Sequence, residues 1–173
     1  MTDTAKIEHN VRWITVCGCL MAINTLLSSF GIPVPGGHIY LNDIIIVSAA
    51  LSLDPLGAFI VGGIGAFLGD FFFYPLPMFV SLFTHGIRSV VISLIARTYG
   101  KERYPMVIFA VIIGAVIAVA GYTFGKAYIY STPEYALMKL PFEIAQAAVG
   151  SAVAVYLWKY RHFSELVKKA LGR

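Results

Sequence analysis

Charged residues are scarce in this chain. Asp, Glu, Lys and Arg make up 13% of the 173 residues and 58% are hydrophobic, whereas roughly 25% charged residues is usual for soluble domains. A water-soluble globular domain is therefore excluded, and the composition indicates a protein embedded in the lipid bilayer. The length allows one domain, residues 1–173, with at most about six or seven spans of about 20 residues each.

Cysteine is nearly absent. Cys17 and Cys19 are two residues apart in one apolar run, so a helix would point them to different sides. This spacing argues against a disulfide between them and against a zinc site. The sequence also lacks other metal-ligand spacings, a nucleophile elbow and a Walker motif. We therefore expect no metal and no cofactor, and any uphill transport must draw its energy from a partner.

The net charge of +4 does not indicate a nucleic-acid partner, because the basic residues flank apolar runs instead of forming an aromatic-interleaved patch. Their distribution predicts membrane orientation. With six spans, ten of the thirteen Lys and Arg residues fall on one side and two on the other, with Arg88 inside a span. By the positive-inside rule both termini are cytoplasmic, and the loops at 31–42, 74–77 and 125–140 face outward.

The expected fold class is an all-α integral membrane protein with six transmembrane helices. The apolar stretch 39–73 is too long for one crossing, and Asp54-Pro55 is suited to start a new helix within it. Pro141 is expected to start the last span in the same way. The spans are predicted at residues 12–30, 43–53, 55–73, 78–99, 106–124 and 141–158.

Three further segments have recognisable patterns. Small residues at Ala58, Gly62 and Ala66 predict that the third span packs closely against other helices. The fifth span, 106–124, has no ionisable residue and is expected to be scaffold. Residues 160–172 place apolar side chains on one helical face and lysines opposite, which predicts a cytoplasmic helix lying on the membrane interface. No internal repeat indicates a transporter built from two similar halves.

Polar side chains are expected to gather in the outer half of the bundle. Because such groups are costly in hydrocarbon, each is a candidate for function. Residues three or four apart are neighbours on a helix, so His85 lies beside Arg88, and Glu143 beside Gln146. With residues of the first outer loop, they complete the predicted substrate-binding set: His38, Tyr40, Asn42, His85, Arg88, Glu143 and Gln146.

Structural interpretations of these polar residues stay open. Asp43 can cap the second span, and Asp70 can form a buried pair with Arg88, so Asp43 and Asp70 are expected to be mainly architectural. Glu143 would lie in a first helical turn, where the helix dipole alone favours a carboxylate. His85 can be satisfied by a neighbouring helix.

Two interpretations of the first outer loop also stay open. His38 and Tyr40 belong either to a lid over the site or to an ordered turn.

Several motifs carry a resemblance to a known family. They are Gly37-His38-Ile-Tyr-Leu-Asn-Asp43, a Gly-rich third span ending at Gly69-Asp70, and Thr84-His-Gly86. With six short spans and cytoplasmic termini, the chain resembles the substrate-binding S components of energy-coupling factor (ECF) vitamin transporters over nearly its whole length. It looks closest to the branch of hydroxymethylpyrimidine and pyridoxine carriers, and less like the riboflavin or folate branches.

The resemblance implies a membrane subunit of bacterial cells that binds a vitamin near the outer face and is not itself an enzyme. It implies a transmembrane coupling (T) subunit and two cytoplasmic ATPase subunits as partners, and reorientation of the whole S component in the bilayer. Many members contact the coupling subunit through Ala-xxx-Ala in the first helix. The nearest equivalent here is Gly18 with Ala22, in which glycine replaces the first alanine.

Pyridoxine or hydroxymethylpyrimidine ranks first as the ligand, because a few donors and acceptors with aromatic rings suit a heteroaromatic alcohol. Pantothenate or another small vitamin is the alternative, with Arg88 or Lys139 as the cation for a carboxylate. An intramembrane lipid-modifying enzyme is the alternative of another class, with His85, Glu143 and Asp70 as acid and base groups. The outward placement of these groups counts against an enzyme, and the dry inner halves of the spans count against a channel.

Overall fold

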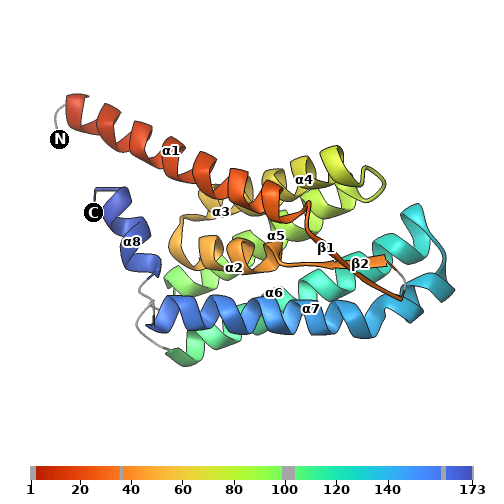
Figure 1. Cartoon of the computed structure of the whole chain (residues 1–173). Helices are drawn as coiled ribbons and strands as arrows, with labels where there is room; N and C mark the ends of the chain where they lie inside the picture. Colours follow the sequence, from red (N-terminus) through yellow and green to blue (C-terminus); the bar gives the residue numbers. More distant parts are fainter. Residues whose placement is uncertain (1–2, 36, 99–103, 161–162, 173) are drawn as a thin grey trace.

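The computed structural model describes residues 3–35, 37–98, 104–160 and 163–172, and it is an all-helical bundle with one short β-hairpin (Figure 1). The predicted all-α fold class is confirmed. The elements are α1 (Asp3–Leu27), β1 (Gly31–Val34), β2 (Gly37–Tyr40), α2 (Asn42–Ser52), α3 (Pro55–Phe59), the π-helix η1 (Ile60–Ile64), α4 (Gly65–Phe73), α5 (Met78–Thr98), α6 (Tyr104–Gly125), the π-helix η2 (Lys126–Tyr130), α7 (Pro133–Tyr160) and α8 (Phe163–Ala170).

Within the described residues, five helical segments are long and apolar enough to cross a membrane. They are Asn10–Leu27, Pro55–Phe73, Met78–Thr98, Tyr104–Tyr130 and Pro133–Tyr160. The expected second span is the shorter apolar helix α2, whose 11 residues extend about 16 Å, about half of a hydrocarbon core.

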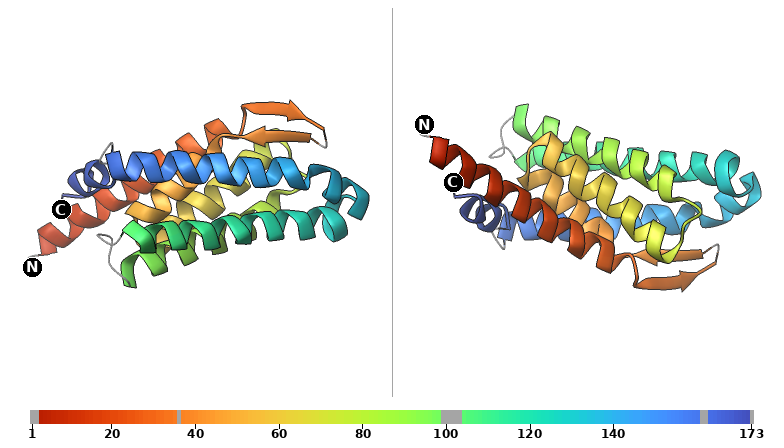
Figure 2. Two further views of the ribbon diagram at one scale, coloured as in Figure 1. Left: turned by 90° about the horizontal axis from the view of Figure 1, so that it is seen from below. Right: turned by 90° about the horizontal axis from the view of Figure 1, so that it is seen from above.

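The expected outer loop is an antiparallel hairpin that continues from the N-terminal end of α2 (Figure 2). Gly31 pairs with Tyr40, and Val34 pairs with Gly37. Gly37 has a φ of +127°, a conformation that residues with a Cβ rarely adopt. The hairpin, the turn between α4 and α5 and the turn before α7 lie at one end of the bundle, and both chain termini lie at the other (Figures 1 and 2).

The short helix α2 is the centre of the bundle. Nine of its 11 residues are buried, and it packs against α1, α3, α5, α7 and α8. Val47 and Leu51 belong to one apolar cluster with residues of α3, α5, α6 and α7. Ala49 and Leu53 belong to a second cluster with α1, η1 and α8. The position of α2 therefore decides which polar residues of the surrounding helices meet.

The third span packs closely, as its small residues predict. Ala58, Gly62 and Ala66 are all buried. A methyl group added at Gly63 would lie 3.0 Å from the Cα of Gly86 on α5, so the two helix backbones are nearly in contact. Within the π-helical turn, the backbone oxygen of Val61 accepts a hydrogen bond from Asn24 of α1 at 2.7 Å. This bond ties α1 to the third span.

Two predicted boundaries need correction. The last span begins at Pro133 and not at Pro141, which lies inside α7. Thr132 precedes this helix and its hydroxyl accepts a hydrogen bond from the backbone N–H of Tyr135, a capping contact that places Pro133 in the first turn. The fifth span does not end at residue 124, because its helix continues as η2 to Tyr130. The expected long outer loop 125–140 is therefore mostly helical.

The C-terminal helix α8 packs on protein, which changes the prediction of a helix lying freely on the membrane interface. Val167 of α8 and Leu171, the residue after it, are buried in a cluster with Trp13 and Cys17 of α1, while Leu166 is exposed. The apolar face that we expected at the membrane interface is thus covered in part, at Val167 and Leu171. The expected boundary residues Tyr99, Arg161 and His162, and the basic residues Lys101, Arg103 and Arg173 used for orientation, lie outside the described residues.

Candidate functional site

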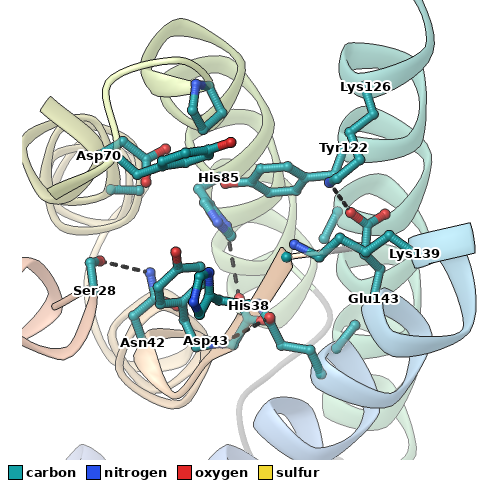
Figure 3. Close-up of a pocket in the computed structure, with 18 of the residues that line it drawn as sticks. Ser28, His38, Asn42, Asp43, Asp70, His85, Tyr122, Lys126, Lys139 and Glu143 are labelled. Atoms are coloured by element: carbon teal, nitrogen blue, oxygen red, sulfur yellow. Dashed lines mark hydrogen bonds and ion pairs between the residues drawn. The ribbon is translucent and has the colours of Figure 1, made fainter. Parts of the chain in front are cut away.

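A polar cavity lies at the hairpin end of the bundle (Figure 3). Its volume is ≈ 80 Å³, measured as the space that the centre of a water-sized sphere can occupy. The hairpin and α2 cover one side, and α4, α5, α6, η2 and α7 form the rest. The polar and aromatic lining residues are Ser28, His38, Tyr40, Asn42, Asp43, Asp70, Tyr74, His85, Tyr122, Lys126, Tyr130, Tyr135, Lys139, Glu143 and Gln146.

At the inner end of the cavity, Asp43 of α2 pairs with Arg88 of α5. Arg88 Nη1 lies 2.5 Å from Asp43 Oδ1, and both side chains are almost completely buried. His85 completes this group, with its Nδ1 3.5 Å from Arg88 Nη1 and 3.9 Å from Asp43 Oδ1. Arg88 does not itself line the cavity. Its expected role as a ligand contact is therefore replaced by an ion pair beneath the site.

This pairing corrects two structural expectations. Asp70 does not pair with Arg88, because Arg88 is already held by Asp43. Asp43 does not cap α2 either, since it lies inside the first turn, the capping position is Leu41 and no side chain caps the helix there. Asp70 instead accepts a hydrogen bond from the Ser81 hydroxyl on α5. Ser81 in turn lies 2.5 Å from the Tyr122 hydroxyl of α6, and the Tyr122 ring contacts His85 edge-on with ring centres 5.2 Å apart.

A second buried ion pair joins η2 to α7. Lys126 binds the carboxylate of Glu143, and the Thr123 hydroxyl donates to the same carboxylate at 3.3 Å. The Lys126 ammonium also lies over the rings of Tyr122 and Tyr130, 5.2 and 5.7 Å from their centres. Glu143 is thus held by several protein contacts, and its position inside α7 removes the helix-start explanation for a carboxylate there.

The hairpin is fastened to the bundle through Gln146. The backbone N–H of Tyr40 donates to Gln146 Oε1 at 2.9 Å, and Gln146 Nε2 donates to Asp43 Oδ2 at 3.4 Å. Burial, followed by the negative charge of Asp70, raises the pKa of the Tyr40 hydroxyl, so this phenol stays protonated at neutral pH. Tyr40 therefore presents a neutral hydroxyl beside the cavity, and Gln146 positions the strand that carries it.

Asn42 offers an unused acceptor. Its Nδ2 donates to the Oγ of Ser28, the residue after α1, at 3.1 Å, while its Oδ1 is buried and has no hydrogen-bond partner among the described residues. A buried carbonyl oxygen without a partner is costly unless a ligand or water supplies a donor. Asn42 is accordingly one of the groups that a bound molecule can satisfy.

Six of the seven predicted substrate-binding residues line the cavity, and Arg88 does not. The two residues expected to be architectural, Asp43 and Asp70, line it as well. Sequence reasoning missed Tyr122, Lys126 and Tyr130, because the fifth span was ended too early and treated as scaffold. It missed Tyr135 because the last span was expected to start at Pro141. The signal was present in the spacing of Tyr122, Lys126 and Tyr130, which are four residues apart and share one helical face.

Other site chemistries find little support. Among the described residues, no group of three or more His, Cys, Asp or Glu is arranged to hold a metal ion. The cavity offers neutral donors, charged side chains and aromatic rings. This combination suits the binding of a small polar molecule.

The face of α1 that was expected to contact a coupling subunit points away from the bundle. A methyl group added at Gly18 would have no atom within 4 Å, and Ala22 is exposed. On the opposite face, Asn24 and Ser28 are buried and bind the third span and Asn42. Helix α1 therefore has one free face of small residues and one face joined to the cavity.

Comparison with known proteins adds one match. A family model described as "ECF-type riboflavin transporter, S component" matches residues 8–161. This match covers all the elements that form the cavity. No curated protein matches the chain.

Proposed function

The chain belongs to the family of ECF-type riboflavin transporter S components, and on this basis we propose that it binds a small heterocyclic vitamin for an ECF importer. An S component is a substrate-binding transport subunit and not an enzyme. The T subunit and the two ATPase subunits are the partners that this role requires. The proposed ligand is pyridoxine or hydroxymethylpyrimidine, with pantothenate or another small vitamin as the alternative.

The size of the cavity is the observation that carries the choice of a small ligand. A volume of ≈ 80 Å³ is several times the roughly 10–15 Å³ that one water molecule needs on the same measure. It is a modest space for the three fused rings and the sugar-alcohol chain of riboflavin, the vitamin in the family's description. The aromatic walls and neutral hydroxyls support a single heteroaromatic ring.

We also propose that the cavity end of the protein faces outward and that both termini are cytoplasmic, in the bacterial cell membrane. The uneven distribution of Lys and Arg supports this orientation. The arrangement of the elements agrees, because the hairpin and the two turns lie together at the end opposite the termini (Figure 1). A vitamin would then reach the site from outside through the region of the hairpin.

Binding to the purified chain without its partners tests the proposal. Calorimetry or thermal-shift measurements would use pyridoxine, hydroxymethylpyrimidine, pantothenate, thiamine and riboflavin, without ATP. We expect tight binding of one single-ring vitamin. Exclusive binding of riboflavin would refute the ligand class while keeping the role of the subunit, and no response to any vitamin would refute the role itself.

A further inference from the structure

Lys139 of α7 is a cation in the cavity without a protein partner. Within the described part of the chain, it forms neither a hydrogen bond nor an ion pair. Its side chain reaches from α7 toward the middle of the pocket (Figure 3). A methyl group added at Gly37 would lie 3.4 Å from the Lys139 Nζ, so the ammonium lies directly beside β2.

Asp70 of α4 is the matching anion on the other side of the cavity (Figure 3). Its carboxylate accepts the Ser81 hydroxyl, but among the described residues no cation pairs with it. A partly buried carboxylate has room for more than one donor, because each oxygen accepts two hydrogen bonds. Asp70 and Lys139 therefore face the cavity with opposite charges and with free bonding capacity.

The remaining charges at the cavity are already balanced in pairs. Arg88 neutralises Asp43, and Lys126 neutralises Glu143. Counting histidine as neutral, Asp70 and Lys139 bring the total to three carboxylates against three cations. A ligand with a net charge would leave one charge uncompensated in a poorly solvated site, which is costly. A ligand without net charge is therefore favoured.

From these observations we propose that Lys139 and Asp70 select a heteroaromatic ligand that is neutral overall but dipolar. An acidic oxygen on the ring binds the Lys139 ammonium, and an N–H donor at another position of the same ring binds the Asp70 carboxylate. This inference rests on the proposed function and narrows it. It favours pyridoxine, whose ring carries both an acidic hydroxyl and a basic nitrogen, over hydroxymethylpyrimidine, which lacks the acidic hydroxyl. It disfavours the pantothenate anion and the thiamine cation.

The first test changes the ligand and leaves the protein intact. Calorimetry on the purified full-length chain would compare pyridoxine with its analogue lacking the ring hydroxyl. Because a hydrogen bond to a charged group is lost, we expect the analogue to bind about 10- to 100-fold more weakly. Equal affinities for the two compounds would overturn the inference, and tighter binding of pantothenate would do the same.

The second test removes each charge in turn. Lys139→Met should abolish the preference for pyridoxine over the analogue, and Lys139→Arg should keep part of it. Asp70→Asn should weaken the binding of pyridoxine by about tenfold or more, since the N–H donor of the ligand loses a charged acceptor. Lys159→Met is the matched control, because Lys159 lies at the other end of α7 against Tyr104 and Tyr160. It should leave both affinities unchanged.

The outcomes separate the inference from the proposed function. If pyridoxine binds and Lys139→Met keeps the full preference for the ring hydroxyl, the assignment of Lys139 is wrong while the vitamin-binding role stands. If the wild-type chain binds no vitamin at all, the role fails and the inference fails with it. The ligand-side comparison needs no variant, so it decides the matter even if a substitution disturbs folding.

Discussion

At the scale of single residues, the Asp43–Arg88 pair shows how a charge that looks functional can be structural. Arg88 is completely buried, and two of its nitrogen atoms, Nε and Nη2, have no partner in the described residues. Among the described residues, the one carboxylate paired with it is Asp43, which comes from α2 and also accepts a hydrogen bond from Gln146. The pair thus stabilises the inner wall of the cavity, and its removal should lower the free energy of unfolding.

Asp43→Ala should lower stability strongly, because it leaves the Arg88 charge buried without compensation. The expected loss is about 3–5 kcal/mol in the free energy of unfolding. Thermal melting of the purified protein, followed by its loss of binding to pyridoxine or by size-exclusion chromatography, measures the change. The double variant Asp43→Ala with Arg88→Met removes both charges and should melt closer to wild type. A double variant no more stable than Asp43→Ala would contradict the buried-charge explanation.

At the scale of helices, the close approach of α2 and α7 holds the site together. A methyl group at Gly150 of α7 would lie 2.5 Å from the Cβ of Asp43, closer than real Cβ contacts allow. Any larger side chain at this position must push the two helices apart. The displacement would carry Asp43 away from Gln146 and loosen the hairpin that Gln146 holds.

Gly150→Ala should therefore destabilise the protein by about 1–3 kcal/mol and weaken vitamin binding. The matched control is Gly18→Ala on α1, where the added methyl meets no atom within 4 Å. The control should equal or exceed wild type in stability, since alanine favours the helix over glycine by up to about 1 kcal/mol. Melting temperature and calorimetric affinity report both effects. Equal melting temperatures and affinities of the two variants would show that α2 and α7 are not packed closely at Gly150.

At the scale of the whole molecule, one face of α1 is free of the bundle and the opposite face is joined to the cavity. Its buried face binds the third span through Asn24 and reaches Asn42 through Ser28, while Gly18 and Ala22 lie on the opposite side. Contact of a partner with the free face would thus act on an element that also touches the site. This arrangement supports the proposal that the T subunit docks on α1.

Gly18→Leu should weaken association with the T subunit while leaving vitamin binding intact. A bulky side chain in a close helix contact costs about 1–3 kcal/mol, or roughly a 5- to 150-fold loss in affinity. Co-purification with the T and ATPase subunits, alongside calorimetry on the isolated chain, separates the two properties. Ala152→Leu, at an exposed alanine of α7, is the control and should assemble normally. Unchanged assembly of Gly18→Leu would place the contact elsewhere.

The sequence by itself determined the membrane class, the all-helical fold, the family and eight of the residues that line the cavity. These conclusions depend on local properties, because the cost of placing an apolar or polar side chain in lipid is set by the residue and its near neighbours. Pro55 and Pro77 marked helix starts for the same reason, whereas Pro141 lies inside a helix. Asp54 and Pro55 start α3 as expected, with Asp54 as the N-cap residue.

Only the tertiary structure decided which charges meet. Arg88 binds Asp43, 45 residues away, and not the nearer Asp70, while Lys126 joins Glu143 from a helix predicted to end before it. Such pairings depend on the depth and rotation of whole helices, which are set by the packing of α2 at the centre of the bundle. The hydrophobic pattern of the sequence does not specify how far each helix is rotated. Asp70 and Lys139 form no ion pair with any described residue, and this could be recognised only after the other charges had been paired in space.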